Sequence, residues 1–271
     1  MLETTSLLFI SALLIQKKRV PRAFVYFLTQ SWASLFILGR FFSTSALSSL
    51  ISLTGLLVKL GGAPLHTWYP SVAKELTWKD NFTLSTVIKI LPLYLLFTAT
   101  PLVDKIRLGV LNCVVGAYGG LRIYCCRKII AYSSVRHLGW IILRIRSVKL
   151  TAIYFGCYMI LNFWVVNDFE KANIFYLRER RPAFNLIIRL LSLRGLPPLL
   201  GFVPKWVLLR ELALTNTFFI RVALLTRIFS LFFYMRTILK SFFFAPLNSF
   251  VLTIITHSVL CLPLVWSIVA I

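Results

Sequence analysis

Long runs of apolar residues recur along almost the whole chain, separated by short segments that hold glycine, proline or clustered charge. A run of about 18 or more apolar residues is long enough to cross a bilayer as a helix. With those short segments as boundaries, the pattern predicts about ten helices. Their ranges are 2–16, 24–41, 45–68, 81–101, 107–124, 127–145, 150–167, 184–212, 217–239 and 249–270. None of the connecting segments is long enough to fold separately, so we expect a single integral membrane domain over residues 1–271.

Composition strengthens the membrane assignment. Hydrophobic residues make up 59% of the 271 residues, against roughly 45–50% in soluble domains, and the mean hydropathy is +0.84. We therefore expect an all-α, polytopic membrane helix bundle.

The net charge of +22 would suggest nucleic-acid binding in a soluble chain. Here the basic residues are distributed between the predicted spans, as in "IQKKRVPRA" and "FYLRERRPAF". Such clusters are typical of cytoplasmic or matrix-side loops, and they also attract anionic lipid headgroups. We therefore expect lipid contacts, with cardiolipin as one candidate, and no nucleic-acid partner.

Two predicted spans contain helix-breaking residues at membrane depth, in "VKLGGAPLHTW" and "LSLRGLPPLLGFVPKW". The predicted break residues are Gly61, Gly62, Pro64, Pro197, Pro198 and Pro204. Glycine weakens a helix, and proline cannot donate the backbone hydrogen bond of a helix interior. Non-helical backbone persists at this depth only where it is buried in protein or lines a wet cavity, and transporters use such half-helices to bind ions. We therefore expect two broken helices beside a hydrated ion path.

Four lysines lie deep in predicted spans or beside a helix break: Lys59, Lys89, Lys128 and Lys205. A charged side chain at the bilayer centre costs roughly 2.5–3.5 kcal/mol on insertion scales. Low-dielectric surroundings disfavour the charged form of a lysine, so a buried lysine can release its proton. We therefore predict that these residues relay protons. The alternative is a structural role, as expected for lysines that lie near span ends, where the ammonium group reaches the interface: Lys17, Lys18, Lys149 and Lys240.

His66 follows Lys59 by seven residues, so on an unbroken helix both residues would share a face. His66 is therefore a candidate proton relay, and a hydrogen-bonded structural role is equally open. His137 and His257 are interpreted as structural. The five cysteines have no metal-ligand spacing, so we expect no metal site and assign them no redox chemistry.

Four longer stretches of the chain follow a known family pattern: "KLGGAPLHTWYP", "VIKILPLYLL", "RKIIAYSSVRHLGW" and "LSLRGLPPLLGFVPKWVLLREL". Three shorter ones, "YFLTQSWAS", "GAYGGL" and "FFYMR", fit the same pattern in the same order. Through these stretches the chain resembles the NADH–ubiquinone oxidoreductase chain 2 family, whose members are antiporter-like, proton-pumping membrane subunits of respiratory complex I. Together the stretches cover essentially the entire chain.

The resemblance implies a core membrane-arm subunit of the NADH:ubiquinone reductase, with proton translocation coupled to electron transfer. It implies no cofactor in this chain, because FMN, the iron–sulfur clusters and ubiquinone belong to other subunits. Lys59 matches the lysine of the first broken helix, Lys89 that of the next helix, Lys128 the following lysine, and Lys205 that of the second broken helix. Glu3 matches the glutamate that pairs with the first lysine.

The chain also departs from the family pattern. It starts almost at Glu3, so we expect it to lack the helices that precede this point in longer relatives. We expect another chain to complete the bundle near Glu3, beside neighbouring antiporter-like subunits. Bacterial and plastid relatives are much longer, which favours the mitochondrial inner membrane as the location.

Arginine is a second departure. Arg136 and Arg194 stand where the family pattern has small residues, and further arginines lie in or near apolar spans. One explanation is a conceptual translation with the wrong mitochondrial code, in which some arginine codons mean serine or glycine. The other is real arginines that pair with carboxylates, lipid or neighbouring subunits.

Two other functions remain as alternatives. A membrane subunit of a related cation/proton antiporter or of a membrane-bound hydrogenase would share the lysines. A non-catalytic scaffold would use the lysines only structurally. Co-purification with flavin and iron–sulfur subunits would separate complex I from the first alternative, and a lysine variant that assembles without pumping would exclude the second.

Overall fold

The computed structural model describes residues 20–42, 46–99, 102–121, 123–143, 148–172, 184–196, 199–213, 221–222 and 225–226. The predicted helices 2–16 and 249–270, and almost all of 217–239, lie outside these residues. Glu3, Pro197 and Pro198 lie outside them too. The count of about ten spans therefore stays a prediction.

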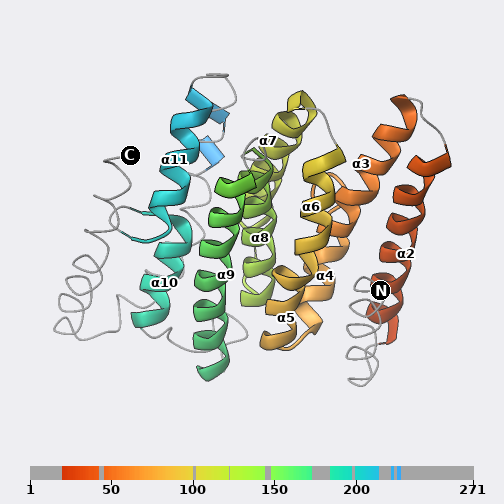
Figure 1. Cartoon of the computed structure of the whole chain (residues 1–271). Helices are drawn as coiled ribbons and strands as arrows, with labels where there is room; N and C mark the ends of the chain where they lie inside the picture. Colours follow the sequence, from red (N-terminus) through yellow and green to blue (C-terminus); the bar gives the residue numbers. More distant parts are fainter. Residues whose placement is uncertain are drawn as a thin grey trace.

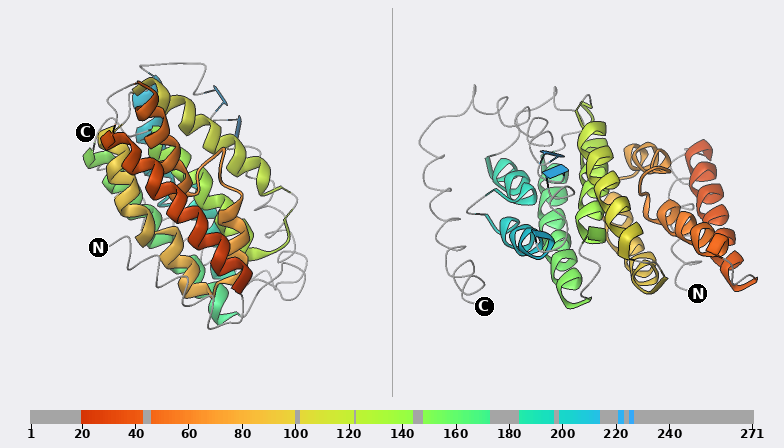
Figure 2. Two further views of the ribbon diagram at one scale, coloured as in Figure 1. Left: turned by 90° about the vertical axis from the view of Figure 1, so that its right-hand side faces the viewer. Right: turned by 90° about the horizontal axis from the view of Figure 1, so that it is seen from above.

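The described residues form ten α-helices and one 3-10 helix, and the predicted all-α class is confirmed for this part of the chain (Figure 1). The helices are α2 (Val20–Phe42), α3 (Ala46–Leu60), α4 (Trp68–Glu75), α5 (Trp78–Ser85), η1 (Val87–Lys89), α6 (Ile90–Ala99), α7 (Leu102–Gly119), α8 (Cys126–Leu143), α9 (Val148–Lys171), α10 (Phe184–Arg194) and α11 (Phe202–Ala213). They cross the bundle in roughly chain order, from α2 at one edge to α10 and α11 at the other (Figures 1 and 2).

Helix α8 is the centre of the bundle. It supplies Ile129, Ala131, Trp140 and Leu138 to four different buried apolar clusters, which it shares with helices on all sides. Its side chains from 133 to 143 are all buried. A helix that is buried on every face is surrounded by protein, so α8 is the element against which the functional segments are positioned.

Helices α7 and α8 lie close enough for their backbones to touch. A Cβ on Gly139 of α8 would lie 2.6 Å from the carbonyl oxygen of Gly109 and 2.7 Å from the backbone nitrogen of Cys113, both on α7. Small residues permit this approach, which is a common way for membrane helices to pack. The α7–α8 pair therefore requires glycine at position 139.

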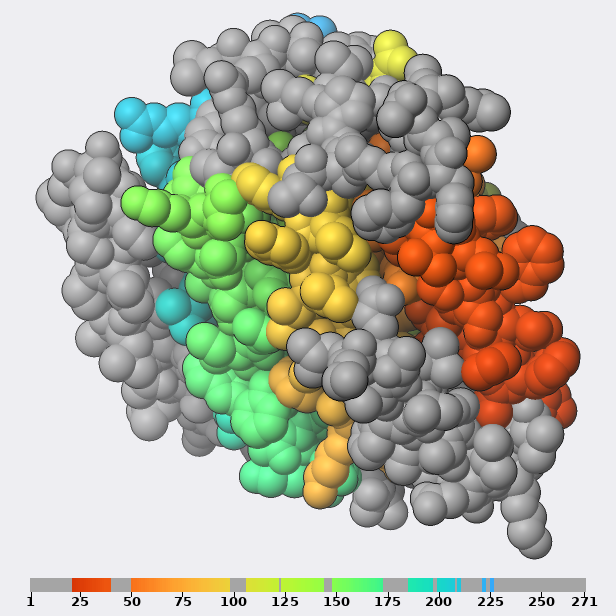
Figure 3. All heavy atoms as spheres, turned by 45° about the vertical axis from the view of Figure 1, so that its right-hand side comes forward, coloured from red at the N-terminus to blue at the C-terminus, as the bar shows by residue number. Residues whose placement is uncertain are grey.

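Two helical segments of the described chain are long and apolar enough to cross a membrane, Trp78–Phe97 and Val148–Lys171. Only 39% and 33% of their apolar windows are buried inside the bundle, so most of this apolar surface faces outward. On one face of the molecule the side chains of α6 and α9 lie side by side, with α2 at the edge (Figure 3). Outward-facing apolar side chains of this kind suit contact with lipid or with other membrane helices.

The segment between the predicted helices 45–68 and 81–101 is itself mostly helical, which the apolar pattern did not predict. It forms α4 and α5, and Thr77 begins α5 with a capping box. The Asp80 amide donates to Thr77 Oγ1, and the Thr77 amide donates to Asp80 Oδ2, both at 3.4 Å. These bonds satisfy amides that have no acceptor in the first turn of a helix.

The predicted helix 81–101 is interrupted at Thr86, the residue between α5 and η1. The hydroxyl groups of Ser85 and Thr86 both donate to the Phe82 carbonyl oxygen, at 2.9 and 2.7 Å. Such bonds compete with the helical ladder. Farther along, Pro92 has no amide hydrogen to continue that ladder. Lys89 therefore closes a 3-10 turn instead of lying in regular α-helix.

Candidate functional site

The first break begins where α3 ends. Gly61 has a φ of 66°, a left-handed conformation that costs glycine nothing. Its amide donates to the carbonyl oxygen of Val58 at 3.0 Å. The amide of Gly62 donates to the carbonyl oxygen of Leu57 at 2.8 Å. This pair of bonds is a Schellman motif, which satisfies the last carbonyl groups of a helix, and the next helix begins only at Trp68.

Side chains from other elements stabilise the non-helical backbone of this break. The Ala63 amide donates to Oδ1 of Asn112, a buried residue of α7, at 2.7 Å. Trp68 Nε1 donates to the carbonyl oxygen of Val58 at 3.1 Å. A buried backbone group without a partner costs roughly 1–3 kcal/mol, so these contacts allow the break to exist inside the bundle.

Lys59 lies in the last turn of α3 and is 7% exposed. His66 lies in the non-helical segment and is half-buried, and its Nδ1 is 3.1 Å from the Pro64 carbonyl oxygen. Because α3 ends at Leu60, the unbroken helix that would put Lys59 and His66 on one face is absent. The His66 ring instead meets the edge of Tyr132 on α8, with ring centroids 6.1 Å apart.

The second break has the same chemistry at the end of α10. Gly195 has a φ of 75°, and its amide donates to the carbonyl oxygen of Ser192 at 2.9 Å. The Leu196 amide donates to the carbonyl oxygen of Leu191 at 3.4 Å, which completes a second Schellman motif. A Cβ on Gly195 would lie 2.4 Å from the carbonyl oxygen of Gly201, so the chain returns very close to the end of α10.

Lys205 lies in α11 and reaches back to the end of α10. It is 3% exposed, and its Nζ donates to the carbonyl oxygens of Leu193 and Arg194 at 2.7 and 2.6 Å. Pro204 was predicted as a break residue, but it lies inside α11, which begins at Phe202. Proline fits there because amides in the first turn of a helix have no helical acceptor.

Lys89 lies at the junction of η1 and α6 and is 3% exposed. Its Nζ donates to Ser134 Oγ on α8 at 2.7 Å and lies 4.3 Å from the ring centroid of Tyr69 on α4. The Tyr69 hydroxyl also donates to Ser134 Oγ, at 3.1 Å. Sequence reasoning named Lys89 but not Ser134 or Tyr69, because only the tertiary fold brings α4 and α8 to this lysine.

Lys128 lies in the first turn of α8 and is half-buried, as expected for a residue that opens a span. The four predicted lysines therefore belong to α3, η1, α8 and α11, elements that follow one another across the bundle (Figures 1 and 2). The structure buries Lys59, Lys89 and Lys205 more deeply than Lys128.

His137, which the sequence analysis interpreted as structural, lines one small cavity together with Lys205. It is buried in α8, with Nδ1 3.0 Å from the Tyr154 hydroxyl and its ring 4.9 Å from that of Tyr158. The positive charges that act on its imidazole are those of Lys205, Arg136 and Lys89. No local sequence pattern distinguishes such a histidine from a structural one.

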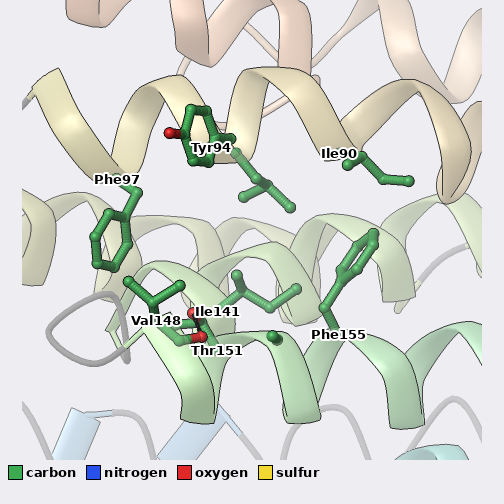
Figure 4. Close-up of a pocket in the computed structure, with 9 residues that line it drawn as sticks. Ile90, Tyr94, Phe97, Ile141, Val148, Thr151 and Phe155 are labelled. Carbon is green, nitrogen blue, oxygen red and sulfur yellow. Dashed lines mark hydrogen bonds between the residues drawn. The ribbon is translucent and has the colours of Figure 1, made fainter.

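Two cavities differ in chemistry. One of about 10 Å³ is lined by His137, Tyr158 and Lys205 among others, close to the roughly 10–15 Å³ that one water needs. The other, of about 190 Å³, lies between α6, α8 and α9 and is lined mainly by apolar side chains such as Ile90 and Phe155 (Figure 4). Of the described residues, Tyr94 is the one ionisable residue that borders the larger cavity, whereas His137 and Lys205 border the smaller one.

The arginines at the two unusual positions are deeply buried, Arg136 at 2% and Arg194 at 1% exposure. Among the described residues, no group of three or more histidine, cysteine, aspartate or glutamate side chains is arranged to hold a metal ion. The ionisable groups that this part of the chain concentrates inside the bundle are therefore mostly basic.

Comparison with known sequences follows this geometry. Residues 5–230 match the family described as NADH:quinone oxidoreductase/Mrp antiporter, TM. NADH-ubiquinone oxidoreductase chain 2 of Anopheles gambiae is 34% identical over 233 residues, which cover 78% of this chain and 68% of that one. The protein of the same name from Xenopus laevis is 35% identical over 237 residues, covering 78% and 69%.

Solved structures show the same fold at lower identity. A chain of respiratory complex I from Thermus thermophilus with bound aureothin has a TM-score of 0.78 at 23% identity, covering 94% of this chain and 69% of that one. A chain of the Mrp complex from Dietzia sp. DQ12-45-1b has a TM-score of 0.70 at 18% identity, covering 81% and 50%.

Proposed function

This chain belongs to the NADH:quinone oxidoreductase/Mrp antiporter membrane family, and we propose that it is a core membrane-arm subunit of respiratory complex I that translocates protons. The similarity to curated chain 2 proteins over most of the chain supports this choice within the family. Its place is the mitochondrial inner membrane, among other membrane-arm subunits and lipid. The flavin, iron–sulfur and quinone chemistry belongs to those other subunits.

One observation carries the mechanism: three buried lysines each lie at a point where helical backbone is interrupted. Lys59 lies beside the first Schellman motif, Lys89 closes the 3-10 turn, and Lys205 contacts the carbonyl groups of the second motif. Interrupted backbone at membrane depth is the usual setting of ion sites in transporters. Lys59, Lys89, Lys128 and Lys205 form the proposed relay, and Glu3 joins it as the partner of Lys59.

Electrostatic coupling between these groups moves the charge along the chain of sites. Charges inside a protein interact far more strongly than in water, so protonation of one lysine disfavours protonation of its neighbour. We assign His137 to the step between Lys89 and Lys205, and this assignment is supported by the cavity of one-water size that it shares with Lys205 and by the charges of both lysines that act on it. His66 contributes at the first break.

The experiment is Lys89→Met in the assembled complex, with the proton-to-electron ratio and turnover measured in proteoliposomes. Methionine keeps the bulk of lysine and removes the titrating amine, so we expect assembly and a sharp loss of coupled proton transfer. Lys79→Met is the control, because that side chain is 81% exposed and its contact with Glu170 is long, at 3.7 Å. A normal proton-to-electron ratio in Lys89→Met would refute the relay and leave a scaffold.

A related cation/proton antiporter or hydrogenase-type subunit is the second candidate. The likeness to a chain of the Mrp complex favours it at the level of fold. The chains that co-purify with this protein decide between the two. Flavin and iron–sulfur subunits would support complex I, and other Mrp-type subunits would support the antiporter.

A further inference from the structure

We propose that Tyr69 and Ser134 are positioning residues for Lys89, holding its amine in one place whether it is charged or neutral. The inference rests on the proposed role of Lys89 in proton transfer. Lys89, Tyr69 and Ser134 come from η1, α4 and α8, so the arrangement exists only in the folded bundle. All three side chains are buried.

The contacts of Lys89 are a hydroxyl group and an aromatic face. Nζ donates to Ser134 Oγ at 2.7 Å and lies 4.3 Å from the centroid of the Tyr69 ring. The ring attracts the ammonium through its quadrupole, and the attraction is stronger away from water. A ring and a hydroxyl carry no net charge, so they favour the charged amine without binding its proton as firmly as a carboxylate would.

Ser134 can serve both protonation states of Lys89. A serine hydroxyl has one hydrogen to donate and two lone pairs that accept. With Lys89 charged, the lone pairs accept from Lys89 Nζ and from the Tyr69 hydroxyl, as the structure has them. With Lys89 neutral, rotation of the Ser134 hydroxyl directs its hydrogen to Nζ, while Tyr69 still donates to Ser134.

Tyr69 is itself fixed by the first helix break. A Cβ on Gly61 would lie 2.9 Å from Cβ and Cγ of Tyr69, so the ring packs directly on the glycine that ends α3. Trp68 meets Tyr69 edge-on, with ring centroids 5.7 Å apart. The residue that contacts Lys89 therefore also contacts the backbone that follows Lys59, which gives the two lysine sites a common neighbour.

The test uses Tyr69→Leu, which removes the ring and the hydroxyl, and Tyr26→Leu as its matched control. Tyr26 and Tyr69 are both 1% exposed and belong to the same apolar cluster, but the ring beneath Lys89 is that of Tyr69. We expect both variants to lower the thermal stability of the assembled complex. Coupled turnover per assembled complex should fall about tenfold in Tyr69→Leu only, because only that change removes a desolvated cation–π contact.

Conservative variants separate positioning from packing. Tyr69→Phe keeps the ring, so it should retain turnover within about twofold of the unmodified protein. Ser134→Ala should reduce turnover, whereas Ser133→Ala should not, because the Ser133 hydroxyl donates to its own helix at Ile130. The serine pair also decides the question if Tyr69→Leu does not assemble.

Double variants distinguish this inference from the proposed function. In a Lys89→Met background, Tyr69→Leu should cause no further loss of turnover. The positioning role would be overturned if Tyr69→Leu lowered turnover as much in the Lys89→Met background as in the otherwise unmodified protein. Equal turnover for the single variants Tyr69→Leu and Tyr26→Leu would overturn it too. Normal proton translocation by Lys89→Met alone would instead overturn the proposed function.

Discussion

Lys205 Nζ donates a hydrogen bond to the carbonyl oxygen of Arg194, at 2.6 Å, across the break between α10 and α11. A side chain from the first turn of one half-helix therefore satisfies the end of the preceding half-helix. A cation at a helix C-terminus also interacts favourably with the helix dipole. Lys205 is thus a structural residue of the break as well as a relay candidate. Substitution of Lys205 should therefore affect assembly and stability more than substitution of Lys89.

Lys205→Met should impair assembly more than Lys89→Met does. The substitution removes a charged donor from the carbonyl groups of Leu193 and Arg194, and a hydrogen bond to a charged group contributes roughly 1.5–3 kcal/mol. We expect less assembled complex on native gels and a lower melting temperature, in addition to lost proton transfer. Equal abundance and melting temperature for Lys205→Met and Lys89→Met would contradict the capping role.

Gly195→Ala should destabilise the second break. At a φ of 75° an L-residue costs about 1–2 kcal/mol, and the new Cβ would lie 2.4 Å from the Gly201 carbonyl oxygen. Gly156→Ala is the control, because nothing lies within 4 Å of a Cβ there and alanine favours the helix. Thermal unfolding of the two assembled variants checks the prediction, and equal melting temperatures would argue against a strained break.

Sequence patterns predicted the two breaks because Gly61 and Gly195 act through the local backbone. Pro204 was misassigned because proline is equally at home in the first turn of a helix, and only the position of the Phe202 start decides between the two. The helix start at Thr77 was missed although its two capping residues, Thr77 and Asp80, are only three positions apart.

The partners of the lysines could not be predicted in the same way. Ser134 and Tyr69 are separated from Lys89 by long stretches of chain, and their hydroxyl groups meet only where α4 and α8 pack on η1. His137 has no local feature that distinguishes it from a core histidine. The deep lysines were found because their burial in an apolar span is unusual in itself.

The ion pair between Arg189 of α10 and Asp168 of α9 should stabilise the fold more than the pair between Lys79 of α5 and Glu170 of α9. Arg189 Nη1 donates to Asp168 Oδ1 at 2.7 Å, and the two side chains are 28% and 14% exposed. Removing Arg189 leaves a mostly buried carboxylate, so Arg189→Met should lower stability by roughly 1–3 kcal/mol. Lys79→Met, which removes the exposed contact with Glu170, should change it by at most about 1 kcal/mol. Similar shifts in melting temperature would show that Arg189 is not a structural link.

Arg136→Ser should leave assembly intact and should not lower coupled turnover. Arg136 is 2% exposed, and its charge acts on His137 together with those of Lys89 and Lys205. Like charges in a low-dielectric interior raise one another's free energy. Arg136 adds a charge that the family pattern lacks, so its removal should reduce the repulsion among the basic side chains around His137. A tryptic digest first shows which residue the protein carries, because a real arginine yields separate peptides 129–136 and 137–144. If the arginine is real and Arg136→Ser lowers turnover per assembled complex, that charge belongs to the relay and the expectation fails.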